Sequence, residues 1–317
     1  MTFGPVPSRR LGQSVGINNI PPKSCTYSCV YCQLGRTKKM HAERRQFYEP
    51  ENIQKSVTEK IASADKTKER IDYLTFVPDG EPTLDVNLGK EIELIRKNGK
   101  KIAVITNASL IWDDKVKDDL KKADWVSVKV DAVQKDIWRK INRPHRALEL
   151  ENILQGIIEF SKEFHGNLVT ETMLVRDLND SQEYIKKVAN FMSTLSPNTS
   201  YLSIPIRPPA EKWVQPPRED SLIRAYHLMN MQIKNVEYLI GYEGNAFAFT
   251  GDVEKDLLNI TAVHPMREEA IDEFLKKAGS NWSVVEKMIE RDLLLRKNFQ
   301  ENTFYARKLY HSQKKLK

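Results

Sequence analysis

The amino-acid sequence predicts an α/β fold, in which a partial (β/α)6 barrel is followed by a small winged-helix-like domain. Short β-branched runs alternate with amphipathic helical stretches from about residue 14 to residue 240, which is the pattern of βα units around a parallel sheet. Six such units are too few to close an eightfold barrel, so the barrel should be open. In such barrels the functional groups lie at the C-terminal ends of the strands.

The expected elements of the barrel alternate along the chain. Strands are expected at residues 14–18, 71–77, 101–106, 125–131, 168–175, 200–206 and 236–240. Helices are expected at residues 50–64, 86–98, 113–122, 148–164, 181–195 and 218–232. Leu150, Ile153 and Ile157 recur at three- and four-residue steps, so this helix should pack one apolar face on the sheet. The proline-rich stretch from Pro205 to Pro217 should form a stiff loop over the barrel mouth.

The chain is expected to divide into a barrel at residues 1–252, a winged-helix-like domain at 253–310 and a basic tail at 311–317. The expected elements of the second domain are three helices followed by two strands that form a hairpin. The helices are expected at residues 253–260, 266–278 and 282–291, and the strands at 293–297 and 303–307.

Composition and charge limit the possible classes of protein. The chain has 317 residues, 40% hydrophobic and 29% charged, as expected for a globular protein. Its net charge of +7 permits binding to a nucleic acid, but it equally fits a lysine-rich solvated surface. The sequence shows no signal region at its start and no apolar run of about 18 residues, so we expect a cytoplasmic protein without a membrane partner.

The three cysteines of the chain form the decisive motif. Cys25, Cys29 and Cys32 make a CxxxCxxC pattern just after the first predicted strand, which excludes a disulfide framework and implies a reducing compartment. Thiolates at this spacing can bind three irons of a 4Fe-4S cluster and leave the fourth iron open to another ligand. A structural zinc site would need a fourth ligand, for which His41 is the nearby candidate. We therefore predict that the three cysteines are ligands of a 4Fe-4S cluster.

With Tyr31 directly before the third cysteine, the motif resembles that of the radical S-adenosylmethionine (SAM) superfamily. The resemblance implies a partial radical SAM barrel and an iron-sulfur enzyme of the oxidoreductase or lyase type, with a 4Fe-4S cluster and SAM as cofactors. The open iron would bind SAM through its amino and carboxylate groups. One electron from an external flavodoxin- or ferredoxin-like donor would then cleave SAM, and the resulting 5′-deoxyadenosyl radical would abstract hydrogen from a substrate.

Two segments at predicted strand ends extend this resemblance. The segment Asp79-Gly80-Glu81 looks like the GGE motif of the superfamily, in which Gly80 would permit close approach of the backbone and Glu81 would receive the SAM amino group. Taken alone, the segment is typical of a turn between a strand and a helix. Asn107 ends the next strand, where its amide could serve a polar ligand or cap the following helix.

Polar residues also interrupt two later strands. Ser127, Lys129 and Asp131 alternate and should share one face, where Ser127 and Asp131 could bind a ribose if that face is the barrel interior. The alternative is a solvent-facing edge strand. Glu171 interrupts an apolar run and could meet SAM or the substrate. The expected cofactor-binding residues are Tyr31, Asp79, Gly80, Glu81, Asn107, Ser127, Asp131 and Glu171.

Within the superfamily, the sequence is most similar to the wyosine synthase-related group that modifies tRNA. The similar segments are 80–83, 131–132 and 140–144, while 3–12 and 263–267 resemble a distinct branch of that group. Archaeal wyosine enzymes add a second set of cysteines for another cluster, and this sequence has no further cysteine. The resemblance therefore implies a branch with a single cluster.

The sequence leaves three functional hypotheses open. The first is an enzyme acting on an RNA (tRNA) base, with the winged-helix-like domain contacting RNA through Lys287, Arg291, Arg296 and Lys297. The second is a protein- or peptide-modifying enzyme or an activase. The third is a redox-sensing regulator that binds nucleic acid, which the ordered SAM-type motifs disfavour. Acidic residues nearly balance the basic ones in the second domain, so it could also dock a protein or serve as a structural cap.

Overall fold

The computed structural model describes residues 1–37, 40–241, 244–245 and 247–308. Its centre is an open eight-stranded sheet in the order β1-β2-β3-β4-β5-β6-β7-β8, with β1 and β8 at the two edges of the part described. Strands β2 to β8 run parallel, and β1 is antiparallel to β2. The strands are β1 (Thr2–Ser8), β2 (Gly12–Ile17), β3 (Tyr73–Phe76), β4 (Lys101–Thr106), β5 (Trp125–Lys129), β6 (Asn167–Met173), β7 (Thr199–Ser203) and β8 (Val236–Leu239). The predicted partial barrel is confirmed.

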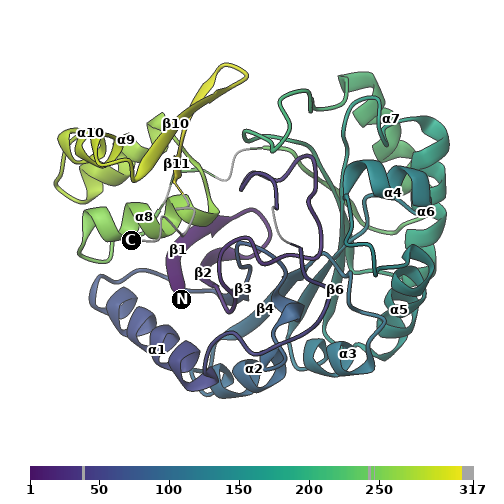
Figure 1. Cartoon of the computed structure of the whole chain (residues 1–317), viewed down its shortest axis with the longest axis horizontal. Coiled ribbons are helices and arrows are strands. Elements are labelled where there is room, and N and C mark those ends of the chain that lie inside the picture. Colours follow the sequence, from purple (N-terminus) through teal and green to yellow (C-terminus); the bar gives the residue numbers. More distant parts are fainter. Residues whose placement is uncertain (38–39, 242–243, 246, 309–317) are drawn as a thin grey trace, which may run out of the picture.

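Helices follow the strands and lie around the outside of the curved sheet (Figure 1). They are α1 (Pro50–Lys66), α2 (Leu88–Arg96), α3 (Asp114–Leu120), α4 (Lys135–Ile141), α5 (Leu150–Glu163), α6 (Gln182–Leu195) and α7 (Glu219–Asn230), with a short 3-10 helix η1 (Pro82–Leu84). The apolar face predicted for α5 is confirmed, because Leu150, Ile153 and Ile157 are buried in the main core.

Two elements of the barrel escaped the sequence prediction. Strand β1 contains Gly4, Pro5 and Pro7, residues that normally argue against a strand. The sheet accommodates them because β1 is an edge strand and its pairing register shifts between Phe3 and Val6. Helix α4 spans only 7 residues, and its last two residues belong to the segment 140–144 that sequence reasoning treated as a motif.

The strands that carry the predicted polar residues are shorter than expected. The predictions 125–131, 168–175 and 200–206 extend beyond the ends of β5, β6 and β7 at Lys129, Met173 and Ser203. Beyond these strand ends, side chains accept some of the hydrogen bonds that backbone carbonyl groups accept within the sheet. For example, the Asp131 carboxylate accepts a 2.9 Å hydrogen bond from the Met173 backbone N–H. The chain therefore leaves the sheet where the polar side chains gather.

The C-terminal part contains the three helices and the hairpin that the sequence predicted. They are α8 (Val253–Val263), α9 (Glu268–Lys277), α10 (Ser283–Glu290), β10 (Leu294–Phe299) and β11 (Asn302–Arg307). A further strand, β9 (Met266–Arg267), was missed, and it pairs with β11 to complete a small sheet in the order β10-β11-β9. The domain boundary at residue 252 stays a prediction, and the predicted tail at 311–317 lies outside the described residues.

Strand β1 joins the C-terminal part to the barrel. Its buried side chains Phe3 and Val6 share one hydrophobic core with residues of α8, α9 and α10, among them Leu257, Ile260 and Phe274. Figure 1 shows α8 beside β1, at the edge of the sheet. One face of this edge strand is therefore covered by the last part of the described chain.

None of the helices formed by the described residues combines the length and the hydropathy that a membrane span requires.

Phe3 offers a test of this joint. Phe3→Ala should lower the free energy of unfolding by about 3 to 5 kcal/mol, because it removes a buried aromatic ring from the core shared by β1 and the C-terminal helices. Urea unfolding followed by circular dichroism measures the change. The control Met231→Ala removes a side chain that is 81% exposed and should change stability by no more than about 0.5 kcal/mol. Equal stability of the two variants would contradict the shared core.

Candidate functional site

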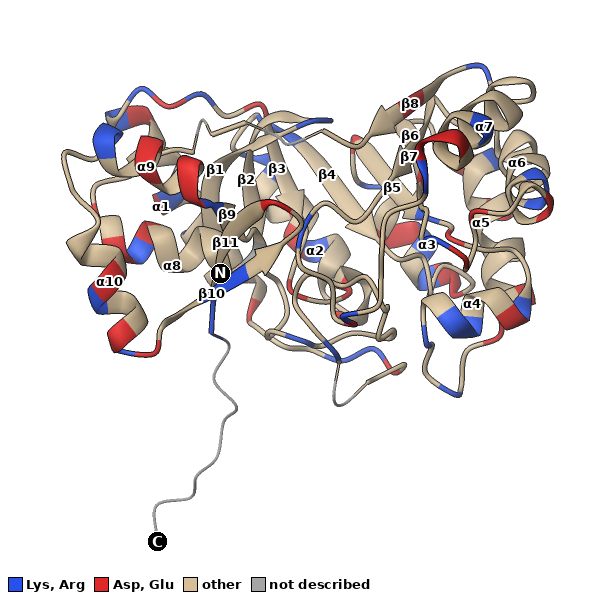
Figure 2. Cartoon of the chain, turned by 90° about the horizontal axis from the view of Figure 1, so that it is seen from above, with Lys and Arg blue, Asp and Glu red and all other residues tan. Residues whose placement is uncertain are grey.

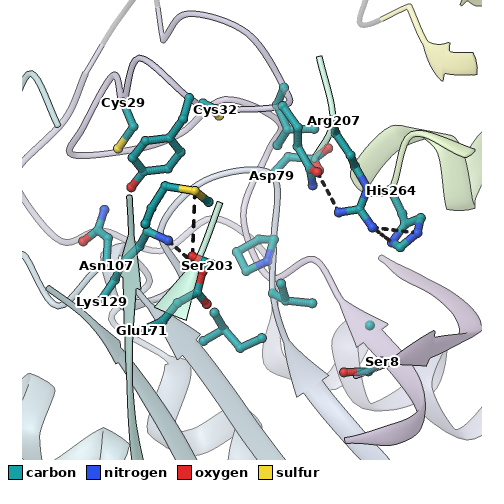
Figure 3. Close-up of a pocket in the computed structure, with 18 of the residues that line it drawn as sticks. Ser8, Cys29, Cys32, Asp79, Asn107, Lys129, Glu171, Ser203, Arg207 and His264 are labelled. Atoms are coloured by element: carbon teal, nitrogen blue, oxygen red, sulfur yellow. Dashed lines mark hydrogen bonds and ion pairs between the residues drawn. The ribbon is translucent and has the colours of Figure 1, made fainter. Parts of the chain in front are cut away.

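The three cysteines lie in the loop after β2, at the C-terminal ends of the parallel strands. Between this loop and the strand ends is a cavity of about 400 Å³. In Figure 3, Cys29 and Cys32 lie above Lys129, Glu171 and Ser203, which come from β5, β6 and β7. The predicted residues Tyr31, Asp79, Gly80, Asn107 and Glu171 line the cavity, whereas Glu81, Ser127 and Asp131 do not.

Each cysteine sulfur is within hydrogen-bonding distance of an N–H donor. The donors are the Tyr27 backbone (3.5 Å) and Asn107 Nδ2 (3.7 Å) for Cys25, Asn142 Nδ2 (3.5 Å) for Cys29, and Lys23 Nζ (3.7 Å) for Cys32. Such bonds stabilise thiolates and adjust the reduction potential of a bound cluster. The loop is therefore built to carry charged sulfur ligands. Asn107 does not cap a helix here, since the N-cap of α3 is Asp113.

The electrostatics of the free thiols agree with a metal-binding role. Burial raises the pKa of Cys25 well above its usual range and that of Cys29 to about 12, so metal binding must displace their protons. Within the described ranges, no three His, Cys, Asp or Glu side chains are placed to share a single metal ion. A cubane cluster does not need such convergence, because each thiolate binds a different iron.

Glu81 organises the strand ends and does not face the cavity. Its carboxylate accepts hydrogen bonds from the Thr83 N–H (3.1 Å) and hydroxyl (2.7 Å), the Thr106 hydroxyl (2.6 Å) and the Asn107 N–H (2.7 Å). The residue is only 1% exposed, and burial raises the pKa of its carboxyl while these hydrogen bonds lower it. The Glu81 carboxylate thus connects the end of β4 to the turn after β3 through hydrogen bonds.

Gly80 lets this turn pack directly against the cysteine loop. A Cβ at this position would lie 1.8 Å from the Ser24 carbonyl oxygen, which also accepts a 3.0 Å hydrogen bond from the Glu81 N–H. Only glycine permits such an approach of two backbones. The structure explains this glycine by its contact with the residue before Cys25, while the predicted close approach to SAM stays a prediction.

Asp79 differs from Glu81 in facing the cavity. It is 2% exposed, and among the described residues its Oδ1 atom has no hydrogen-bond partner. Burial raises the pKa of Asp79 to about 7, although the charges of Lys23 and Arg307 act in the opposite direction. A buried carboxylate oxygen without a partner usually indicates a missing ligand or ion.

Asp131 lies just beyond β5 and binds the aromatic residue of the motif. Its Oδ2 atom accepts hydrogen bonds from the Tyr31 hydroxyl and from Asn142 Nδ2 (2.7 Å). Asp131 is 3% exposed and lines a second, smaller cavity of about 20 Å³ together with Asn107 and Lys129. Since Asn142 also bonds Cys29, one chain of hydrogen bonds connects the cysteine loop to the end of β5.

A buried charge network forms the floor of the cavity. Glu171 accepts hydrogen bonds from Arg10 (2.7 Å), Lys129 (2.9 Å) and Ser203 (2.9 Å). Burial alone would raise the pKa of Glu171, but the charges of Lys129 and Arg10 outweigh it and hold the pKa well below the usual range. Glu171 is therefore a paired anion whose charge is already neutralised by the protein.

Ser127 belongs to the same network. Its hydroxyl accepts a 3.4 Å hydrogen bond from Arg10, and the residue is 1% exposed. Strand β5 lies between β4 and β6, so the solvent-facing edge strand is excluded and the interior interpretation is confirmed. The Arg10 guanidinium lies between the rings of Trp125 and Tyr201, 5.6 and 5.9 Å from their centres.

The family model described as the radical SAM superfamily matches residues 19–192, more than half of the chain. The chain belongs to the radical SAM superfamily. It also belongs to the UPF0026 family, because it is 48% identical over 318 residues to a UPF0026 protein of Methanocaldococcus jannaschii, a match that covers 100% of this chain and 98% of that relative.

Two solved structures are similar to this radical SAM enzyme, and the first shares its fold. A radical SAM methyltransferase from Sphaerobacter thermophilus matches with a TM-score of 0.54 and 13% identity, over 72% of this chain and 66% of that one. A structure of TYW1 with a lysine-pyruvate adduct bound matches with a TM-score of 0.49 and 19% identity, over 69% and 74% of the two chains. The likeness to the methyltransferase concerns the fold alone.

Superfamily membership makes the chain an enzyme that uses a 4Fe-4S cluster and SAM. The residues fit the cluster, because three sulfurs in one loop each have an N–H donor. The sensor hypothesis is therefore excluded.

Sequence reasoning missed the supporting residues Lys23, Asn142, Arg10 and Ser203. Only their proximity in the fold reveals their roles, since Arg10 and Glu171 are 161 positions apart. Asn142 carried one signal, because it lies in the segment 140–144 that resembles the wyosine group.

Gly80→Ala tests the contact between the turn and the cysteine loop. The added Cβ would overlap the Ser24 carbonyl and displace Cys25, so iron retained after anaerobic reconstitution should fall by about tenfold or more. Gly241→Ala is the matched control, because a Cβ there meets no atom within 4 Å. Iron and sulfide assays on both variants measure the effect. Normal iron content in Gly80→Ala would show that the cysteine loop does not require glycine at this position.

Proposed function

We propose that this radical SAM enzyme abstracts a hydrogen atom from a substrate held in the cavity between the cysteine loop and the strand ends. The observation that supports the proposal most strongly is the placement of Cys25, Cys29 and Cys32, whose donor-supported sulfurs border a cavity that charged side chains also line. When bound there, the cluster and SAM supply the chemistry: one electron cleaves SAM to methionine and a 5′-deoxyadenosyl radical.

The residues of this chain would position SAM. Tyr31 lines the cavity and its hydroxyl is held by Asp131 and Asn142, so its ring offers a fixed surface against which the adenosine part can lie. Asp79 suits the amino group of SAM better than Glu81, because Asp79 has a buried oxygen without a partner while Glu81 is fully hydrogen-bonded. Glu171 is paired with both Lys129 and Arg10, so the floor would present polar groups with one excess positive charge to the substrate.

An RNA base remains our first candidate for the substrate. The net charge of +7 supports an anionic partner, and a cavity of about 400 Å³ is large enough for one extruded base. The RNA contact face expected on the winged-helix-like domain gives less support, because two of its cations are already paired with acids. Arg291 pairs with Glu254, and Arg296 pairs with Glu268. Figure 2 likewise shows acidic and basic positions mixed on α9 and α10. A modified base recovered from tRNA incubated with the enzyme would support RNA as the substrate. SAM cleavage without any modified base would exclude RNA as the substrate but would leave the proposed radical chemistry intact.

We also propose a cytoplasmic location, which is supported by an oxygen-sensitive type of cluster and by cysteines that form no disulfide.

SAM cleavage tests the proposal directly. The anaerobically reconstituted enzyme should form 5′-deoxyadenosine from SAM and dithionite, and each of Cys25→Ala, Cys29→Ala and Cys32→Ala should reduce this activity by about a hundredfold or more, because each removes a cluster ligand. Chromatography of the nucleoside products and the absorbance of the cluster are the measurements. Ser28→Ala, in the same loop, should retain its iron. Cleavage that survives the loss of all three cysteines would disprove the proposed site.

The role of Asp79 predicts a pH dependence of SAM binding. With a pKa of about 7, Asp79 is neutral at lower pH and ionised at higher pH, so SAM affinity should rise from pH 6 to pH 8. Asp79→Asn should bind SAM about ten- to a hundredfold more weakly at pH 8 and lose most of this rise. Equilibrium dialysis with labelled SAM measures both. The surface variant Asp118→Asn should follow the wild type, and an identical pH profile in Asp79→Asn would exclude this contact.

A further inference from the structure

Two segments enclose the cysteine loop on the side away from the cavity. The chain after α4 pairs with the loop backbone, as Val30 N–H donates to the Ile141 carbonyl (2.9 Å) and Ser28 N–H to the Asn142 carbonyl (3.1 Å). The loop after β7 does the same through Glu211 N–H and the Val30 carbonyl (3.0 Å). Ser28 and Val30 do not line the cavity, unlike the cysteines around them. These segments therefore form the outer side of the cluster-binding loop.

Five cations belong to the cysteine loop or to the segments that surround it. We call Arg36, Arg139, Lys140, Arg143 and Arg146 the basic face. Arg36 follows the cysteines, Arg139 and Lys140 are at the end of α4, and Arg143 and Arg146 come in the segment after it. None of the five lines a described cavity. Figure 2 shows basic positions on α4.

The basic face carries an excess of positive charge. A single carboxylate, Glu211, pairs with both Arg36 (2.6 Å) and Arg143. Across the described chain, Arg139, Lys140 and Arg146 have no ion-pair partner within 4.0 Å. Asp136 is the exposed acid of α4, so the positive charges outnumber the negative ones.

An exposed tryptophan lies in the loop after β7, which pairs with the cysteine loop. Trp213 is 52% exposed, although its neighbour Val214 is buried against Val30 and Ile141, and Glu211 in the same segment pairs with Arg36. Tryptophan and arginine are the residues most enriched at the energetic centres of protein interfaces. The basic face and Trp213 together have the composition of a protein docking surface.

We infer that the basic face and Trp213 dock an acidic one-electron donor protein of the flavodoxin or ferredoxin class. The inference rests on the proposed function, in which the cluster must receive an electron while SAM and the substrate occupy the cavity. A substrate atom must enter the cavity to react, but an electron can reach the cluster through the protein groups of the cysteine loop. The donor gives up one electron, the cluster accepts it, and no bond or proton changes at the surface.

This geometry favours a protein donor over RNA. An RNA substrate has to place its reacting carbon inside the cavity, whereas the basic face lies on the other side of the loop. Opposite charges steer association and make it dependent on salt, as expected for transient electron-transfer complexes with small interfaces.

Charge reversal separates electron delivery from the chemistry that follows. The variant R139E/K140E/R146E should bind a reduced, acidic flavodoxin at least about tenfold more weakly at low salt and should lose most of its salt dependence. Its formation of 5′-deoxyadenosine should fall by a similar factor with flavodoxin but stay unchanged with dithionite. The control K186E/K234E/K276E makes the same charge change at exposed lysines elsewhere and should behave like the wild type with both reductants.

Trp213 provides a second test that leaves the charge unchanged. Trp213→Ala should weaken flavodoxin binding by about tenfold or more, because a central interface tryptophan commonly contributes this much. Trp112→Ala removes another half-exposed tryptophan, 48% exposed, and should have no effect on binding.

The outcomes are distinct. Flavodoxin binding and flavodoxin-driven cleavage that match the wild type in both R139E/K140E/R146E and Trp213→Ala would overturn the inference. Loss of tRNA binding with unchanged flavodoxin binding would also overturn it and would assign the face to RNA. If the wild type forms no 5′-deoxyadenosine with dithionite, the proposed function is refuted. The flavodoxin-binding measurements would still test the docking surface independently.

Discussion

The buried carboxylate of Glu81 is the interaction on which the site depends. This carboxylate joins the turn after β3 to the end of β4. The backbone N–H of Glu81 donates a hydrogen bond to the carbonyl of Ser24, the residue before Cys25. A carboxylate without water must satisfy its oxygens inside the protein, and Glu81 does so with four hydrogen bonds from the elements it joins. The turn, the strand end and the cysteine loop therefore hold their relative positions together.

A second constraint comes from the charges on the cavity floor. Glu171 meets two cations, Arg10 and Lys129, which are 12% and 19% exposed, in a region where charges cost free energy unless they are paired. Arg10 comes from the turn between β1 and β2, so the N-terminal hairpin closes the bottom of the barrel as well as its edge. The network leaves the cavity polar while fixing which strand ends face one another.

The sequence was sufficient for the cysteine motif, the shared face of Ser127, Lys129 and Asp131, and the apolar face of α5. Each of these rests on local spacing: three cysteines within one octet, a period of two along a strand, or apolar steps along α5. The sequence could not distinguish Glu81 from Asp79, because both are acids in one turn and only the fold decides which faces the cavity. Likewise, β1 was missed because its prolines are acceptable only at an edge, and edge position is a property of the whole sheet.

The arrangement of β1 bears on how the protein is made. A ribosome completes β1 first among the described elements, yet Phe3 and Val6 gain their cover only when α8, α9 and α10 have been synthesised. Until then, a nascent barrel exposes an apolar strand at its edge, which is the kind of surface that pairs with other chains. The growing polypeptide thus carries this uncovered apolar edge for nearly the whole time of its synthesis.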